Sequence, residues 1–167
     1  APILFQYGGI ARLEPDDTVE ELFKTDRASV SYGFLGLDDA VRILSDDKEN
    51  ISTEKGHEMG IAIMEAIRKQ ADDIKIETGL PVSVYGTPAE SSIATFFSKD
   101  VENYGDIMPE WLREREYYTN SFHFSSELPI DSFDKIDVEA PFIKYCNGGN
   151  IMYVENGGKT YNNEAII

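Results

Sequence analysis

One long amphipathic helix is the element that this sequence specifies most clearly. Between Ser52 and Gly79, apolar residues recur at intervals of three or four, which places them on one face of a helix of roughly 25 residues. Gly79 is the expected stop, because glycine readily adopts the left-handed conformation that ends helices. The apolar face is predicted to consist of Met59, Ile63, Ile67, Ala71 and Ile74.

Shorter segments of alternating type lie on both sides of this helix. Helices are predicted at 19–23, 37–44, 106–116 and within 129–136, and strands or extended segments at 1–11, 28–32, 80–85, 117–124, 138–141 and 150–155. Strands that alternate with helices predict an α/β fold, part of a sheet or barrel with helices outside. A chain of 167 residues, 41% of them hydrophobic, is expected to form one compact domain.

Charge and cysteine content exclude some classes of function. The chain has 31 acidic and 15 basic residues, a formal net charge of -16, which disfavours a nucleic-acid surface. Neither a membrane span nor a leader is recognisable, so a soluble, cytoplasmic protein is expected. One cysteine and two histidines predict no internal disulfide and no metal site. Ala1 in place of methionine and the apolar end at Ile167 suggest a piece of a longer chain.

The stretch YGTPAESSIATFF, from Tyr85 to Phe97, has two interpretations. Thr87 suits a helix N-cap, Pro88 the first helical position, and Glu90 would complete a capping box with Thr87. Alternatively, a strand, a glycine and a helix start that offers Ser91 and Ser92 form a seat for a phosphate group. Local helix chemistry favours the first interpretation, and no basic residue nearby in sequence supports the second.

The segment YYTNSFHF, from Tyr117 to Phe124, also has two interpretations. As a buried strand it would carry Thr119, Ser121 and His123 on one face, and each would need a hydrogen-bonding partner. As a solvated edge strand it would need none. His123 by itself indicates a packed, hydrogen-bonded histidine more often than a catalyst.

Two further reactive side chains receive structural assignments. Cys146 lies in KYCNGGN beside a predicted turn at Asn147 to Gly149, with no base or second cysteine nearby in sequence, so a structural role is expected. His57 falls in the first turn of the long helix, where a surface or capping role is expected.

Several segments together resemble the class III anaerobic ribonucleoside-triphosphate reductases, which are glycyl-radical enzymes. They are TGLPVSVYGTPAESSIATFF, REYYTNSFHF and FDKIDVEAPFIKYCNGGNIMYVE, preceded by ASVSYGFLGLDDAV. The resemblance implies a ten-stranded α/β barrel, of which residues 1–167 would be a single fragment from the C-terminal half. It also implies reduction of ribonucleoside triphosphates to deoxyribonucleotides, with formate as the reductant, and a homodimer is a further expectation from exposed sheet edges.

The resemblance also implies roles for particular residues. The turn after residue 86 would hold the substrate phosphates through Thr87, Ala89, Glu90, Ser91 and Ser92, with Glu90 shaping the turn. Asn120, Ser121, His123 and Asn147 would lie near the substrate.

The family's radical machinery is expected outside this sequence. The Gly-Cys-Arg segment with the thiyl cysteine, the glycyl radical and the cysteine zinc site are not found here, and Cys146 does not match the radical cysteine. An S-adenosylmethionine iron-sulfur activase would generate the radical in the family. The chain is therefore interpreted as an inactive fragment of the enzyme. Two alternatives remain: a stand-alone nucleotide-binding or interaction module, and an acidic α/β protein with no small-molecule site.

Overall fold

A computed structural model describes residues 17–25, 27–126, 128 and 130–153. Its elements, in chain order, are α2 (Glu20–Lys24), β1 (Val30–Phe34), α3 (Leu37–Leu44), α4 (Glu54–Thr78), β2 (Val82–Gly86), α5 (Glu90–Tyr104), α6 (Glu110–Arg115) and α7 (Ser132–Ile143). The described part is therefore mixed α/β, as the sequence predicts. None of the helices in these residues is long and apolar enough to cross a membrane.

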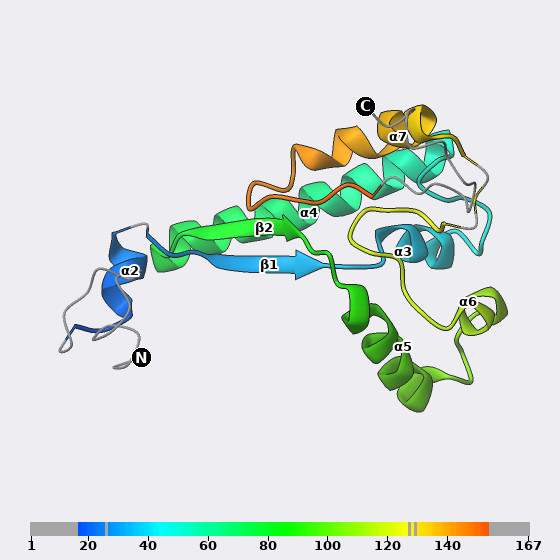
Figure 1. Ribbon diagram of the computed structural model, residues 1–167, viewed down its shortest axis with the longest axis horizontal. Helices are drawn as coiled ribbons and strands as arrows, with labels where there is room; N and C mark the ends of the chain where they lie inside the picture. Colours follow the sequence, from blue (N-terminus) through cyan, green and yellow to red (C-terminus); the bar gives the residue numbers. More distant parts are fainter. Residues whose placement is uncertain (1–16, 26, 127, 129, 154–167) are drawn as a thin grey trace, which may run out of the picture.

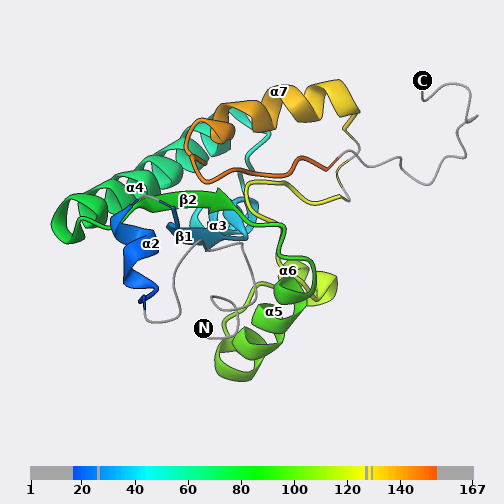
Figure 2. The same cartoon turned by 60° about the vertical axis from the view of Figure 1, so that its left-hand side comes forward.

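The two strands form a parallel pair that lies along the long helix. Val30 pairs with Val82 and Phe34 with Gly86, so both strands end at the same edge. Helix α4 contacts β2, α3 and α7, whereas α5 and α6 lie beyond the carboxyl ends of the strands, away from α4 (Figures 1 and 2). Parallel strands need a crossover between them, and α3 and α4 provide it here.

Helix α4 confirms the prediction of a long helix at both ends. The Thr53 hydroxyl accepts a hydrogen bond from the N–H of Gly56, and Gly79 ends the helix with φ 70°. Its most buried line is Gly56, Gly60, Met64 and Ala71, with the predicted residues Met59, Ile63, Ile67 and Ile74 packed beside it. The two glycines were missing from the predicted face, because a residue without a side chain gives no apolar signal. Gly60 is needed there, since a Cβ would lie 3.1 Å from the Phe142 ring.

Two cores hold the described residues together. The larger one joins α3, α4, β2 and α7 through Val41, Met64, Val84, Phe122 and Phe142, all fully buried. The smaller one, Phe97, Met108 and Leu112, fixes α6 against α5. The position of α5 therefore depends on a small separate core and on the contacts at its start.

Several predictions of secondary structure are wrong. Residues 117–124 form no strand: Asn120 makes one isolated bridge to Leu35, and a turn follows at Ser121, whose φ is 36°. Residues 138–141 belong to α7, because Asp131 caps that helix and Pro141 falls in its last turn. Helix α6 begins only at Glu110, since Pro109 occupies the N-cap position.

The strands predicted near the two chain ends, at 1–11 and 150–155, are not found as strands in the described residues. Asn150 makes a single bridge to Gly86, and residues 151–153 are not in a strand. Residues 1–16 and 154–155, where the first strand and the end of the last one were predicted, lie outside the described residues. The strands predicted at 28–32 and 80–85 are found, at Val30–Phe34 and Val82–Gly86.

Candidate ligand site at the carboxyl ends of the strands

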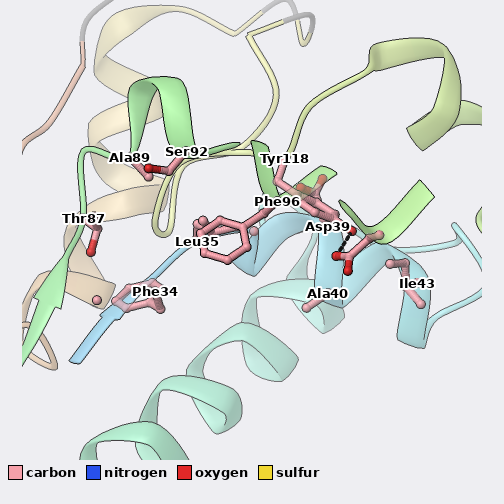
Figure 3. A pocket seen from close by; sticks show the side chains of 13 residues that line it. Phe34, Leu35, Asp39, Ala40, Ile43, Thr87, Ala89, Ser92, Phe96 and Tyr118 are labelled. Atoms are coloured by element: carbon pink, nitrogen blue, oxygen red, sulfur yellow. Dashed lines mark hydrogen bonds between the residues drawn. The ribbon is translucent and has the colours of Figure 1, made fainter. Parts of the chain in front are cut away.

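A cavity of about 460 Å³ lies where β1 and β2 end and α5 begins. Phe34 at the end of β1 and Leu35 after it line the cavity, as do Thr87, Ala89 and Ser92 before and in the first turn of α5 (Figure 3). The rest of the lining consists of Gly33 and Gly36, three residues of α3 (Asp39, Ala40 and Ile43), and the side chains of Phe96, Asp100 and Tyr118. The edge beyond the carboxyl ends of parallel strands is where open α/β sheets bind ligands.

The approach of the two strands at this edge depends on Gly33. A Cβ at that position would overlap the Thr87 hydroxyl and lie 3.3 Å from the Thr87 Cβ. Thr87 itself donates a hydrogen bond of 3.3 Å to the Tyr85 carbonyl. Glycine at residue 33 thus allows Thr87 to stand at the cavity edge.

The start of α5 differs from the capping box that the sequence predicts. The helix begins at Glu90, and Ala89 occupies the N-cap position. Alanine has no side-chain acceptor, so the N-cap residue makes no capping hydrogen bond. Thr87 and Pro88 lie before the helix, so neither has the predicted capping role. Instead, the amide oxygen of Asn120 accepts a hydrogen bond of 3.0 Å from the N–H of Ala89. A residue 31 positions away therefore satisfies the N–H of the N-cap residue itself.

Asn120 is held in turn by a buried ion pair. Asp39 accepts a bond of 2.5 Å from Arg115, one of 2.7 Å from the Thr119 N–H and one of 3.2 Å from the Thr119 hydroxyl. Both charged side chains are only 2% exposed. Gly36 also donates to the Thr119 carbonyl, which fixes this segment against the end of β1. This network fixes the segment that contains Asn120 against α3, and Asn120 in turn contacts the start of α5.

The polar side chains in the cavity lining include the Tyr118 phenol and the carboxyl groups of Asp39 and Asp100. Tyr118 donates a hydrogen bond of 2.7 Å to Asp100. Burial, together with this bond, raises the pKa of the Tyr118 phenol, so the phenol stays protonated. Among the described lining residues there is no lysine or arginine. An anion in this cavity would therefore depend on backbone N–H groups and hydroxyls.

The predicted site residues lie in different places. Thr87, Ala89 and Ser92 line the cavity together, whereas Glu90 and Ser91 are exposed and outside its lining. Asn120 acts on the cavity through Ala89. Asn147 is elsewhere, with its amide oxygen 2.8 Å from the Val84 N–H at the edge of β2.

The segment around His123 is buried, so the solvated edge strand is wrong. Thr119, Ser121, His123 and Ser125 are all at most 4% exposed. His123 is packed and hydrogen-bonded, as the sequence predicts: its Nδ1 lies 2.8 Å from Glu139 and its Nε2 3.0 Å from the Ile151 carbonyl. The Ser121 carbonyl accepts from the N–H of Leu37.

Cys146 and His57, the two other reactive side chains, both pack in or against the core. Cys146 is buried, and burial raises its thiol pKa to about 11, which fits a structural role. His57, for which a surface or capping role was predicted, is half-buried: its ring lies 4.9 Å from that of Phe142, and its Nδ1 lies 3.3 Å from the Ile51 carbonyl just before the helix.

Three charged residues at or beside the cavity were not predicted from the sequence. Asp39, Asp100 and Arg115 were not among the predicted site residues, because a single sequence does not reveal which charges are paired in the interior. One signal was available in the pair Asp38–Asp39, two adjacent acids in the first turn of an apolar helix. Both prove to be almost fully buried.

These features define an α/β protein with a ligand-sized cavity at the carboxyl edge of a parallel strand pair. Residues 1–167 match the family of anaerobic ribonucleoside-triphosphate reductases along their whole length. The chain therefore belongs to that family. The family resemblance in the sequence is thereby confirmed.

Individual relatives carry the same family name. The chain is 38% identical over 167 residues to the anaerobic ribonucleoside-triphosphate reductases of Salmonella typhimurium and Escherichia coli. It is 37% identical over 156 residues to that of Enterobacteria phage T4. These matches cover 99%, 99% and 93% of this chain but 23%, 23% and 24% of the relatives. The chain spans about a quarter of the length of the curated relatives it matches.

Proposed function

We propose that this chain forms part of the nucleotide site of an anaerobic ribonucleoside-triphosphate reductase, and that the start of α5 receives the substrate phosphates. The observation that carries the proposal is the cavity at the carboxyl ends of β1 and β2, with Thr87, Ala89 and Ser92 on its rim. The first N–H groups of a helix generally have no partner within it, and the helix dipole adds partial positive charge there. Both effects favour an anion at this place. In α5 the N–H of Ala89 donates to Asn120 and that of Ser92 to the Ala89 carbonyl, so the N–H groups of Glu90 and Ser91 and the hydroxyls would bind the anion.

The remaining walls suit the rest of a nucleotide. Phe34, Ile43 and Phe96 offer apolar surface, and Asp100 with Tyr118 offers polar groups. Such a combination of apolar lining and a few convergent polar groups is typical of small-molecule sites. In this proposal the phosphates lie at α5 and the nucleoside extends toward α3.

The radical chemistry itself is assigned to other parts of the reductase. In the family a glycyl radical and a thiyl cysteine supply the hydrogen abstraction, with a zinc site and formate as further requirements. The sulfur of this chain does not fit these tasks, since Cys146 is buried, has a raised pKa of about 11 and does not line the cavity. We therefore expect no turnover from this chain by itself. The barrel expected for the family would include β1 and β2 as two of its ten strands.

A matched pair of substitutions on α5 tests the phosphate role. In the complete reductase, Ser92→Asp puts a carboxylate at the proposed phosphate position, whereas Ser98→Asp adds the same charge on the exposed part of the same helix. Aspartate in the first turn favours a helix, so folding is retained. We expect Ser92→Asp to raise the KM for ribonucleoside triphosphate at least tenfold and Ser98→Asp to leave it within about twofold. Equal effects of the two substitutions would contradict the proposal.

The stand-alone nucleotide-binding module is the alternative. It shares the cavity but requires no further segments for its activity. Purified chain that binds ribonucleoside triphosphate but does not restore turnover when added to a reductase lacking this segment would favour the module. Restored turnover would favour the reductase fragment.

A further inference from the structure

Asn120 does not line the cavity at the carboxyl ends of the strands, but it is hydrogen-bonded to the N-cap residue of α5. Its amide oxygen accepts a hydrogen bond of 3.0 Å from the N–H of Ala89. Only the oxygen of an amide side chain accepts from an N–H, so this bond fixes the orientation of the Asn120 side chain. Ala89 is 7% exposed, so its N–H depends on a protein partner rather than on bulk water.

The backbone around Asn120 is held by the beginning of α3. The Thr119 carbonyl accepts a hydrogen bond of 2.8 Å from the N–H of Gly36. The Ser121 carbonyl accepts one of 3.1 Å from the N–H of Leu37. The residues on both sides of Asn120 are therefore fixed to the segment that connects β1 to α3.

The buried ion pair adds a third support to this segment. The carboxylate of Asp39 accepts a hydrogen bond of 2.7 Å from the N–H of Thr119 and pairs with Arg115 at the same time. Asn120 thus extends from a backbone that cannot move without breaking several buried bonds. A side chain on such a rigid support can hold a binding site in its binding geometry before the ligand arrives, which reduces the entropy lost on binding.

The bond between Ala89 and Asn120 also determines which donors are left for a phosphate. The N–H of Ala89 is used by Asn120, and that of Ser92 is used by the Ala89 carbonyl. The next N–H groups along the chain are those of Glu90 and Ser91. Without the bond to Asn120, the peptide group before Ala89 could rotate, and these two donors would no longer have a fixed direction.

We propose that Asn120 is a positioning residue for the phosphate site at the start of α5. It acts through Ala89 and has no contact with the phosphate itself: it holds the N-cap residue so that the N–H groups of Glu90 and Ser91 are directed at one place. The inference rests on the proposed function, because it concerns the same site. A purely structural Asn120 would affect the stability of the chain but not its affinity for substrate phosphates.

Asn120→Ala and Thr53→Ala in the complete reductase form a matched pair. Each removes a side-chain acceptor from a backbone N–H at the beginning of a helix, from Ala89 at α5 or from Gly56 at α4, and Thr53 is not in the cavity lining. Similar losses of stability are expected. The KM for ribonucleoside triphosphate should rise about three- to tenfold in Asn120→Ala and stay within about twofold in Thr53→Ala. The kcat should stay within about twofold in both, because the radical chemistry is assigned elsewhere. An unchanged KM in Asn120→Ala, or an equal rise in both variants, would overturn the proposal.

A second measurement uses the unaltered chain, so it does not depend on the folding of a variant. Hydrogen exchange at the Ala89 N–H should be slow both without and with inorganic tripolyphosphate, because the bond to Asn120 exists before any anion binds. In an NMR titration with tripolyphosphate, the amides of Glu90 and Ser91 should shift more than the side-chain NH₂ of Asn120. Fast exchange of the Ala89 N–H in the free chain, or a shift of the Asn120 NH₂ as large as those of the two amides, would contradict a positioning role.

Failure of this inference can be told apart from failure of the proposed function. If Ser92→Asp raises the KM and Asn120→Ala does not, only the role of Asn120 is refuted. If neither substitution raises the KM, the phosphate site at α5 is refuted as well.

Discussion

Replacement of Asp39 by alanine should be among the most damaging single changes in this chain. Asp39 and Arg115 are each 2% exposed, and the carboxylate also accepts both hydrogen bonds of Thr119. Alanine would leave the guanidinium charge buried, and its Nη1 already lacks a partner among the described residues. Loss of one partner of a buried ion pair costs about 3–5 kcal/mol. For a chain of this length, that corresponds to a fall in Tm of roughly 6–20 °C.

Urea and thermal unfolding of Asp39→Ala and of Asp72→Ala measure this effect against a control. Asp72 also pairs with an arginine, Arg68, at 2.9 Å, but the two side chains are 46% and 30% exposed. An exposed pair of this kind contributes at most about 0.5 kcal/mol. The two variants should therefore differ by at least about 2.5 kcal/mol in the free energy of unfolding. Equal losses would refute the argument that burial makes the Asp39 pair important.

Three further predictions concern other buried positions. Burial raises the pKa of Asp38, so its ionisation lowers the stability of the folded chain as the pH rises through that raised value. Asp38→Asn keeps an acceptor for the Ile51 N–H, so its stability relative to the unaltered chain should increase between about pH 4 and pH 7 in urea titrations, and a difference that does not depend on pH would contradict this argument. Gly33→Ala should displace Thr87 and cost about 1–3 kcal/mol in unfolding experiments, and an unchanged stability would show that Thr87 yields freely. Cys146, with its pKa raised to about 11, should react with a thiol reagent at pH 8 on the order of a hundredfold more slowly in the folded chain than in urea, whereas equal rates would mean that the thiol is accessible.

The regular elements follow from local patterns, and most of them were predictable. Helix α4 is specified by its own period and by Thr53 and Gly79 at its ends. Helix α3 was predicted with the bounds that it has. Both depend on interactions between residues close in sequence, which a single sequence contains.

The elements that were wrong depend on contacts between distant residues. YYTNSFHF has the composition of a strand, but its polar side chains are satisfied by Asp39 and Glu139, which lie far away in sequence. At the start of α5, the N–H of Ala89 donates to the distant Asn120, and the nearby Thr87 does not cap the helix. The sequence of a strand, a glycine and a helix indicated where the cavity lies. The walls formed by α3 and Tyr118 could not be predicted, because they come from residues that only the fold brings together.

The phosphate role of α5 is tested most directly by a proton-nitrogen NMR titration of the chain with a ribonucleoside triphosphate, at about 50 mM and about 200 mM salt. The account predicts saturable shifts concentrated at the amides of Ala89 to Ser92 at both salt concentrations, because a phosphate held at the start of α5 changes the surroundings of these amides. Well-dispersed signals with no shift at these amides, or shifts that vanish at the higher salt, would contradict it.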